Sequence, residues 1–157
     1  FFGGVDSQAA PLARRIKQLG MNATLMGAGG FVSQTFLQLA QKEGDGVVAL
    51  EPGLPVERMP GGKAFEQAYQ SRYHTHIELH APFAYDATRV LVAAMEKADS
   101  VDPADYLPAL RAINYAGVTG QIAFDKEGNL KSPTFTVYKV VEGKWQPQTV
   151  LGGATTQ

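Results

Sequence analysis

The 157-residue sequence contains no cysteine, which excludes disulfides, thiolate metal sites and cysteine nucleophiles. It has no apolar run of about 18 residues, so no membrane insertion is expected. No basic-then-apolar signal segment is present. Charge of one sign is not in excess either, since 14 basic and 15 acidic residues give a net charge of -1. This balance gives no reason to expect nucleic acid or an anionic membrane as a partner. Neither a Gly-x-Ser-x-Gly elbow nor a metalloprotease helix motif occurs, so nothing supports an enzyme.

The first 50 residues alternate short apolar strands with amphipathic helices. Strands are predicted at 1–2, 23–26 and 47–50, and helices at about 6–19 and 33–42. Asp6 or Ser7 is the expected cap of the first helix, and Ser33 that of the second. This order is typical of an α/β fold, and continuous apolar strands favour a parallel sheet buried on both faces.

The pattern changes after residue 50. Residues 51–62 are rich in proline and glycine, which predicts a crossover between domains. Helices are predicted at 63–73, at 82–98 and after Asp102, and strands at 118–124 and 134–141 with a turn at Gly128 between them. The three helices have no sheet of their own, so we expect the missing strands upstream of Phe1 or in a partner chain. The apolar start of the chain also predicts that it is truncated or processed. The uncovered apolar helix faces predict that this piece self-associates or exchanges strands.

A glycine-rich turn at residues 27–30 follows a predicted strand and precedes a helix. Backbone N–H groups and the helix dipole attract anions at such a turn. A dinucleotide site would need glycine where Val32 stands, although Glu51 ends the next strand near where a ribose-binding acid is expected. The alternatives are a plain turn and a turn that lines a cleft for another small ligand, because open α/β sheets bind ligands at this edge.

Two further polar features have a structural and a functional interpretation. Asp6, at the same edge, either caps its helix or pairs with a ligand ammonium group. His74, His76, Glu78 and His80 alternate, so a strand would bring them to one face as metal ligands, but surface polarity explains the pattern equally well. Neither a metal nor a cofactor is expected.

Several short segments carry a family resemblance, and they occur in order over nearly the whole chain. The sequence resembles the periplasmic leucine/isoleucine/valine-binding protein family, type I solute-binding proteins that feed branched-chain amino-acid transporters. The segments are FFGGVD at 1–6, QAAPL at 8–12, KQLG at 17–20, LMGAGG at 25–30, AYDA at 84–87 and FDKEGNL at 124–130.

The resemblance implies two Rossmann-like α/β lobes joined by three crossovers, with the ligand held in the cleft between them. It places this chain in the C-terminal two-fifths of such a protein. Residues 1–52 with 133–150 would belong to the second lobe, 53–132 to the first lobe, and 151–157 to a tail. The implied function is capture of a branched-chain-like amino acid, or a similar small polar solute, for an ABC transporter permease. The implied location is the periplasm, with a signal peptide on the full-length precursor, and the implied protein is not an enzyme.

The family's ligand contacts correspond only in part to this sequence. Its amino-acid binders place an aromatic residue just after the first Gly-Gly turn and an acid in the second glycine turn, where this chain has Val5 and Gly29. Asp6 is therefore the candidate for the ligand ammonium group. The resemblance implies these ligand-binding candidates: Asp6, Val5, Gly4, Gly29, His80 and Phe83. Part of the cleft would lie outside this chain, so the chain alone is not expected to bind its solute tightly.

Two other functions stay open at this point. One is a ligand-sensing domain of a receptor or regulator built on the same fold. The other is a nucleotide-binding α/β enzyme domain that uses the turn at Gly27–Gly30.

Overall fold

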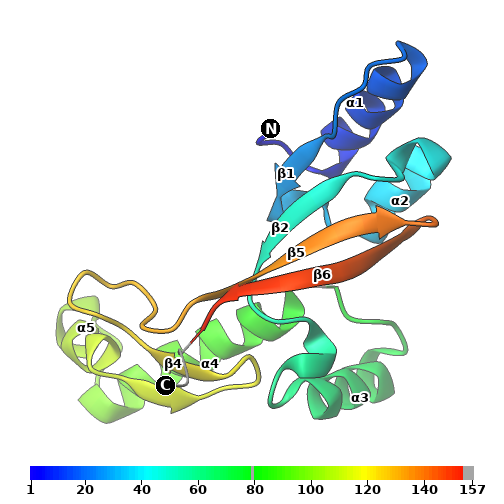
Figure 1. The fold of residues 1–157 in the computed structure, drawn as a ribbon. Helices are drawn as coiled ribbons and strands as arrows, with labels where there is room; N and C mark the ends of the chain where they lie inside the picture. The colour runs from blue at the N-terminus through cyan, green and yellow to red at the C-terminus, as the bar shows by residue number, and fades with distance from the viewer. Residues whose placement is uncertain (79, 154–157) are drawn as a thin grey trace. The chain divides into compact units, whose positions relative to one another are not determined.

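The computed structural model describes residues 1–78 and 80–153, and these fall into two compact units (Figure 1). The first comprises Phe1–Leu54 and the chain from Thr134 onward, and the second comprises Pro55–Pro133. The assignment of segments to two lobes stays a prediction.

The first unit is built on a four-stranded sheet. Its strands are β1 (Met26–Ala28), β2 (Val48–Pro52), β5 (Thr134–Val141) and β6 (Lys144–Gly152), in the order β1-β2-β5-β6. β1 and β2 are parallel, and Phe2 adds a parallel bridge to Gly27. β5 and β6 form the antiparallel hairpin drawn in orange and red in Figure 1.

The parallel arrangement predicted for the strands of the first 50 residues is confirmed, and β5 joins them antiparallel to β2. The chain leaves the sheet after β2 and re-enters it at the same end, where the Gly53 N–H donates to the Thr134 carbonyl at 2.7 Å. A strand that returns at the end where its neighbour left must run in the opposite direction. The α/β class itself is confirmed, with a mixed sheet.

Helices pack on this sheet through small and aromatic side chains. They are α1 (Asp6–Gln18), the 3₁₀ turn η1 (Gly29–Phe31), α2 (Gln34–Ala40) and the 3₁₀ turn η2 (Gln41–Gly44). Phe31 and Phe36 are fully buried and stacked, with ring centroids 6.0 Å apart. The Trp145 ring of β6 lies 5.3 Å from that of Phe36, and its Nε1 donates to the Ser33 carbonyl at 3.3 Å.

Two predicted helix starts have different outcomes. Ser33 caps α2 as predicted, because its hydroxyl accepts the Phe36 N–H at 3.0 Å. The predicted cap of α1 is wrong, since Val5 holds that position and Asp6 is the first helical residue. The first predicted internal strand also lies later than expected, because Gly27 and Ala28 belong to β1.

The second unit contains three of the predicted helices. Its elements are the 3₁₀ turn η3 (Val56–Arg58), α3 (Gly62–Tyr73), α4 (Ala81–Ala98), α5 (Pro103–Arg111), β3 (Asn114–Ala116) and β4 (Gln121–Ala123). The predicted strand at 118–124 is confirmed over β4 but begins too early, because residues 117–120 form the turn of a small hairpin between β3 and β4. The buried Asp86 carboxylate holds the turn between them by accepting the Val118 N–H at 2.9 Å and the Thr119 N–H at 2.7 Å.

β6 extends to Gly152, so the predicted tail at 151–157 begins inside a strand. Residues 154–157 lie outside the described residues.

None of the helices within the described ranges combines the length and apolar character that crossing a bilayer requires.

Candidate functional site

Loops from three neighbouring strand positions meet at the carboxyl edge of the sheet in the first unit. Phe2, β1 and β2 run parallel, so the segments that follow them lie at the same edge. A Cβ atom placed on Gly30 would lie 3.2 Å from the Gly4 carbonyl oxygen and 3.3 Å from Val5 Cγ1. The structure thus brings the predicted residues Gly4 and Val5 into contact with the second glycine turn.

Asp6 ties the first loop to α2. Its Oδ2 accepts the Ser33 hydroxyl at 2.8 Å, and its Oδ1 accepts the Ser7 N–H at 2.6 Å. Ser33 in turn accepts the N–H of Phe36, so one chain of hydrogen bonds connects the starts of both helices. Both carboxylate oxygens therefore have protein donors. A contact between Asp6 and a ligand ammonium group stays a prediction.

Glu51, near the end of β2, is the most deeply buried acidic group at this edge. Its exposed fraction is 2%, and its Oε1 has no hydrogen-bond partner. Burial raises the pKa of this carboxyl group to about 8, and the hydrogen bond from the Val32 backbone N–H opposes the rise. At pH 7 the group is therefore mostly protonated.

The Glu51 carboxyl group lies against Gly29. A Cβ atom on Gly29 would be 2.7 Å from Oε2 and 3.1 Å from Cδ of Glu51, so a side chain at position 29 would require the carboxyl group to move. The sequence predicted only one role for Glu51, that of an acid placed near where a ribose-binding residue is expected. An acid directly after the apolar run 47–50 was the available signal, since it stands where a buried strand reaches the ligand edge.

The turn at Gly27–Gly30 is poorly suited to phosphate. The Val32 N–H lies at the start of the segment that would bind an anion. It already donates a hydrogen bond to the Glu51 carboxyl group. A buried acid beneath the turn would repel phosphate if ionised. Gly27 itself lies in β1 against the Phe31 ring, which an added Cβ would overlap. The nucleotide interpretation therefore has no support in this geometry.

The remaining predicted residues belong to the second unit. His80 is the exposed residue before α4, and Phe83 is a half-buried residue of its first turn. Their role in a ligand cleft stays a prediction. His74 ends α3 in a left-handed conformation, and the described residues from 74 to 80 form no strand. Within residues 1–78 and 80–153, no group of three or more histidine or acidic side chains is arranged to hold a metal.

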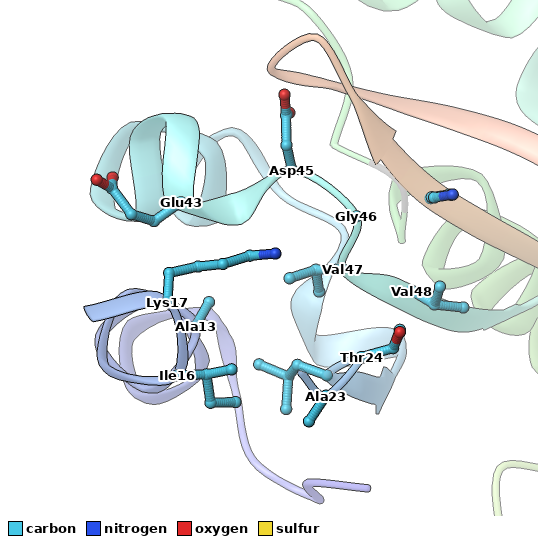
Figure 2. A pocket seen from close by; sticks show the side chains of 12 residues that line it. Ala13, Ile16, Lys17, Ala23, Thr24, Glu43, Asp45, Gly46, Val47 and Val48 are labelled. Atoms are coloured by element: carbon cyan, nitrogen blue, oxygen red, sulfur yellow. The ribbon is translucent and has the colours of Figure 1, made fainter. Parts of the chain in front are cut away.

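A hollow of about 350 Å³ lies at the opposite edge of the same sheet, beside the amino ends of β1 and β2. Figure 2 shows the Lys17 side chain extending into it towards Val47, with Glu43 and Asp45 on the η2 side. None of the predicted ligand-binding residues lines this hollow.

Comparisons with known proteins give consistent results. Residues 1–144 match the sequence profile of a family described as periplasmic binding protein. The chain is 32% identical to the leucine-, isoleucine-, valine-, threonine- and alanine-binding protein of Pseudomonas aeruginosa, over 88% of this chain and 37% of the relative. It is 28% identical to the Leu/Ile/Val-binding protein BraC3 of Rhizobium johnstonii, over 92% and 39%. The chain thus spans about two-fifths of the length of these relatives.

Solved structures share the fold. The leucine-binding protein LivK of Thermotoga maritima superposes with a TM-score of 0.83 at 22% identity, covering 95% of this chain and 43% of that one. LivJ of Streptococcus pneumoniae, in complex with isoleucine, gives 0.76 at 22% identity over 96% and 43%. A solute-binding protein of R. palustris, in complex with benzoate, gives 0.72 at 20% identity over 100% and 43%. At these identities the likeness establishes the fold alone.

Proposed function

Because the chain belongs to the periplasmic binding protein family, whose members are solute-binding proteins and not enzymes, we propose that it forms part of a binding protein for a small amino acid. The protein would capture this solute outside the cytoplasm and deliver it to the permease of an ABC transporter. The names of the curated relatives support a branched-chain-like amino acid as the solute.

This proposal rests on one contact in the first unit. The loop that contains Gly4 meets the turn at Gly27–Gly30 at the carboxyl edge of the sheet; these two segments are called the glycine loops. Gly4 contacts Gly30 there, so little side-chain bulk separates the two loops. Asp6 and Glu51 supply carboxyl groups at the same edge, and open α/β sheets bind ligands at this position. Gly4, Val5, Asp6 and Gly29 would contact the solute from this side.

We assign residues 1–52 and 133–150 to the second lobe and 53–132 to the first, with His80 and Phe83 facing the solute. Closure of the two lobes around the solute would shift a population of open and closed states, and the permease would recognise the closed one.

A carboxylate without an ammonium group is the second candidate solute. Position 29 carries no acid, and the buried Glu51 carboxyl group is mostly protonated at pH 7. A protonated carboxyl group can donate a hydrogen bond to a solute carboxylate. The relative bound to benzoate supports such a ligand class for this fold.

Thermal unfolding of the full-length protein tests these proposals. L-Leucine, L-alanine, benzoate and ATP would each be added at a large excess. A ligand at 100 times its Kd stabilises a protein by about 2.7 kcal/mol, which raises Tm by several degrees. A rise with the amino acids supports the main proposal, and a rise with benzoate alone favours the second candidate. Stabilisation by ATP alone would overturn both.

The 157-residue chain serves as the comparison in the same assay. With part of the cleft outside it, we expect no shift with any ligand, and we expect light scattering to detect self-association. A stable monomer would contradict the second expectation. A receptor or regulator domain is the remaining alternative, and a membrane-spanning or DNA-binding segment in the full coding sequence would identify it.

A further inference from the structure

We propose that Glu51 is the residue that holds the ammonium group of the solute, in place of an acidic side chain at position 29. This inference rests on the proposed function, because it assigns the ammonium subsite of the same binding edge. It moves that role away from Asp6, whose two carboxylate oxygens already accept protein hydrogen bonds.

The first observation is the unsatisfied oxygen of Glu51. Its side chain is almost fully buried, and Oε1 has no hydrogen-bond partner. Buried polar atoms in folded proteins nearly always have partners, so an exception at a ligand edge indicates a missing donor. An ammonium group supplies up to three N–H donors and a compensating charge.

The second observation is the absence of a side chain at Gly29. The backbone of Gly29 does not have the positive φ that favours glycine, unlike Gly20 or Gly46. What requires glycine here is the Glu51 carboxyl group, which lies 2.7 Å from the position of an added Cβ. The Glu51 carboxyl group, which β2 carries, therefore occupies the space beside position 29.

The described elements packed against Glu51 place few titratable side chains at its position. β1 and η1 carry no titratable side chain, and the partner of Glu51 across β5 is Thr136. The titratable residues of β5, Tyr138 and Lys139, pair with Ala49 and Val48 further along the strand. Asp6, on α1, is held by Ser33 and Ser7.

Solute binding would then release a proton. Before binding, most molecules carry the protonated carboxyl group at pH 7. An ammonium group beside it stabilises the carboxylate, so the acidic proton leaves to the buffer and a carboxylate–ammonium pair remains. No bond to the solute forms or breaks.

Calorimetry of the full-length protein tests this assignment with two matched probes. L-Leucine carries the ammonium group, and 4-methylpentanoate is the same skeleton without it. Titration at pH 7 in phosphate and in Tris measures protons released, and we expect release of close to one proton with L-leucine. Glu51→Gln should weaken L-leucine at least tenfold and abolish the release, while Glu43→Gln, at the far edge of the sheet, should change neither.

A relocated acid provides the second variant. Gly29→Glu combined with Glu51→Ala should recover at least part of the L-leucine affinity lost in Glu51→Ala. Equal L-leucine affinity in the parent and Glu51→Gln would overturn the assignment while leaving the proposed function intact. Binding of L-leucine by the parent without proton release would also overturn it, even if the variants fail to fold. Failure of the parent to bind either probe would overturn the proposed function together with this assignment.

Discussion

Asp6 and Ser33 are 27 residues apart in sequence, yet the serine hydroxyl donates to the aspartate carboxylate at 2.8 Å. The same hydroxyl accepts the N–H of Phe36, so it serves as both donor and acceptor. This pair fixes the first glycine loop against the start of α2. It explains how a short loop without bulky side chains keeps a defined position.

Removal of this pair should destabilise the protein. Asp6→Asn and Ser33→Ala should each lower the free energy of unfolding by about 1–2 kcal/mol, because each leaves a hydrogen-bond partner unsatisfied. The double variant should cost less than the sum of the two, with a coupling of about 0.5–1.5 kcal/mol. Urea denaturation measures all three values. Strict additivity would show that the hydrogen bond contributes nothing in solution.

Stability should fall with rising pH because of Glu51. Its folded pKa is raised to about 8 from an ordinary value of 4.5, so the folded state binds the proton more tightly. The contribution of this pKa shift to the free energy of unfolding is fully present below about pH 4.5, and it is lost as the pH rises through 8. Glu51→Gln removes this dependence, so at pH 9 the variant should be more stable than the parent by about 1–3 kcal/mol. Urea melts at pH 5, 7 and 9 measure the difference, and parallel profiles for the two proteins would contradict the raised pKa.

A methyl group at position 29 should be poorly tolerated. Gly29→Ala places a carbon 2.7 Å from Glu51 Oε2, and such overpacking costs about 1–3 kcal/mol. The cost should shrink in a Glu51→Ala background, where the space is free. Gly3→Ala is the matched control, because its nearest neighbour would lie at 3.9 Å and its effect should be small. Thermal unfolding compares the variants, and an equal loss at both glycines would argue against the contact.

Local sequence signals predicted much of the fold, and contacts between distant residues account for the differences. α4 and the cap Ser33 depend on neighbouring residues, so spacing alone locates them. The strand predicted at 118–124 begins only at Gln121 because Asp86, more than thirty residues earlier, holds the turn that precedes β4. The direction of β5 depends on where the chain re-enters the sheet, which no local pattern records.

The candidate site divides in the same way. The glycine loops and Asp6 were visible as motifs, and the structure brings Gly4 and Val5 to Gly30. The burial of Glu51 was not predictable, because an acid at a strand end is exposed in most sequences. Its carboxyl group lies against Gly29 of η1, a contact between residues distant in sequence that no local pattern records.

The indole of Trp145 gives the start of α2 a natural optical reporter. It is the only tryptophan in the 157 residues, and its Nε1 donates to the carbonyl of Ser33, whose hydroxyl donates to Asp6. A rearrangement of the loops would alter the polarity around a single fluorophore. The intrinsic emission of the unlabelled protein can therefore follow events at the glycine loops in real time, without any introduced dye.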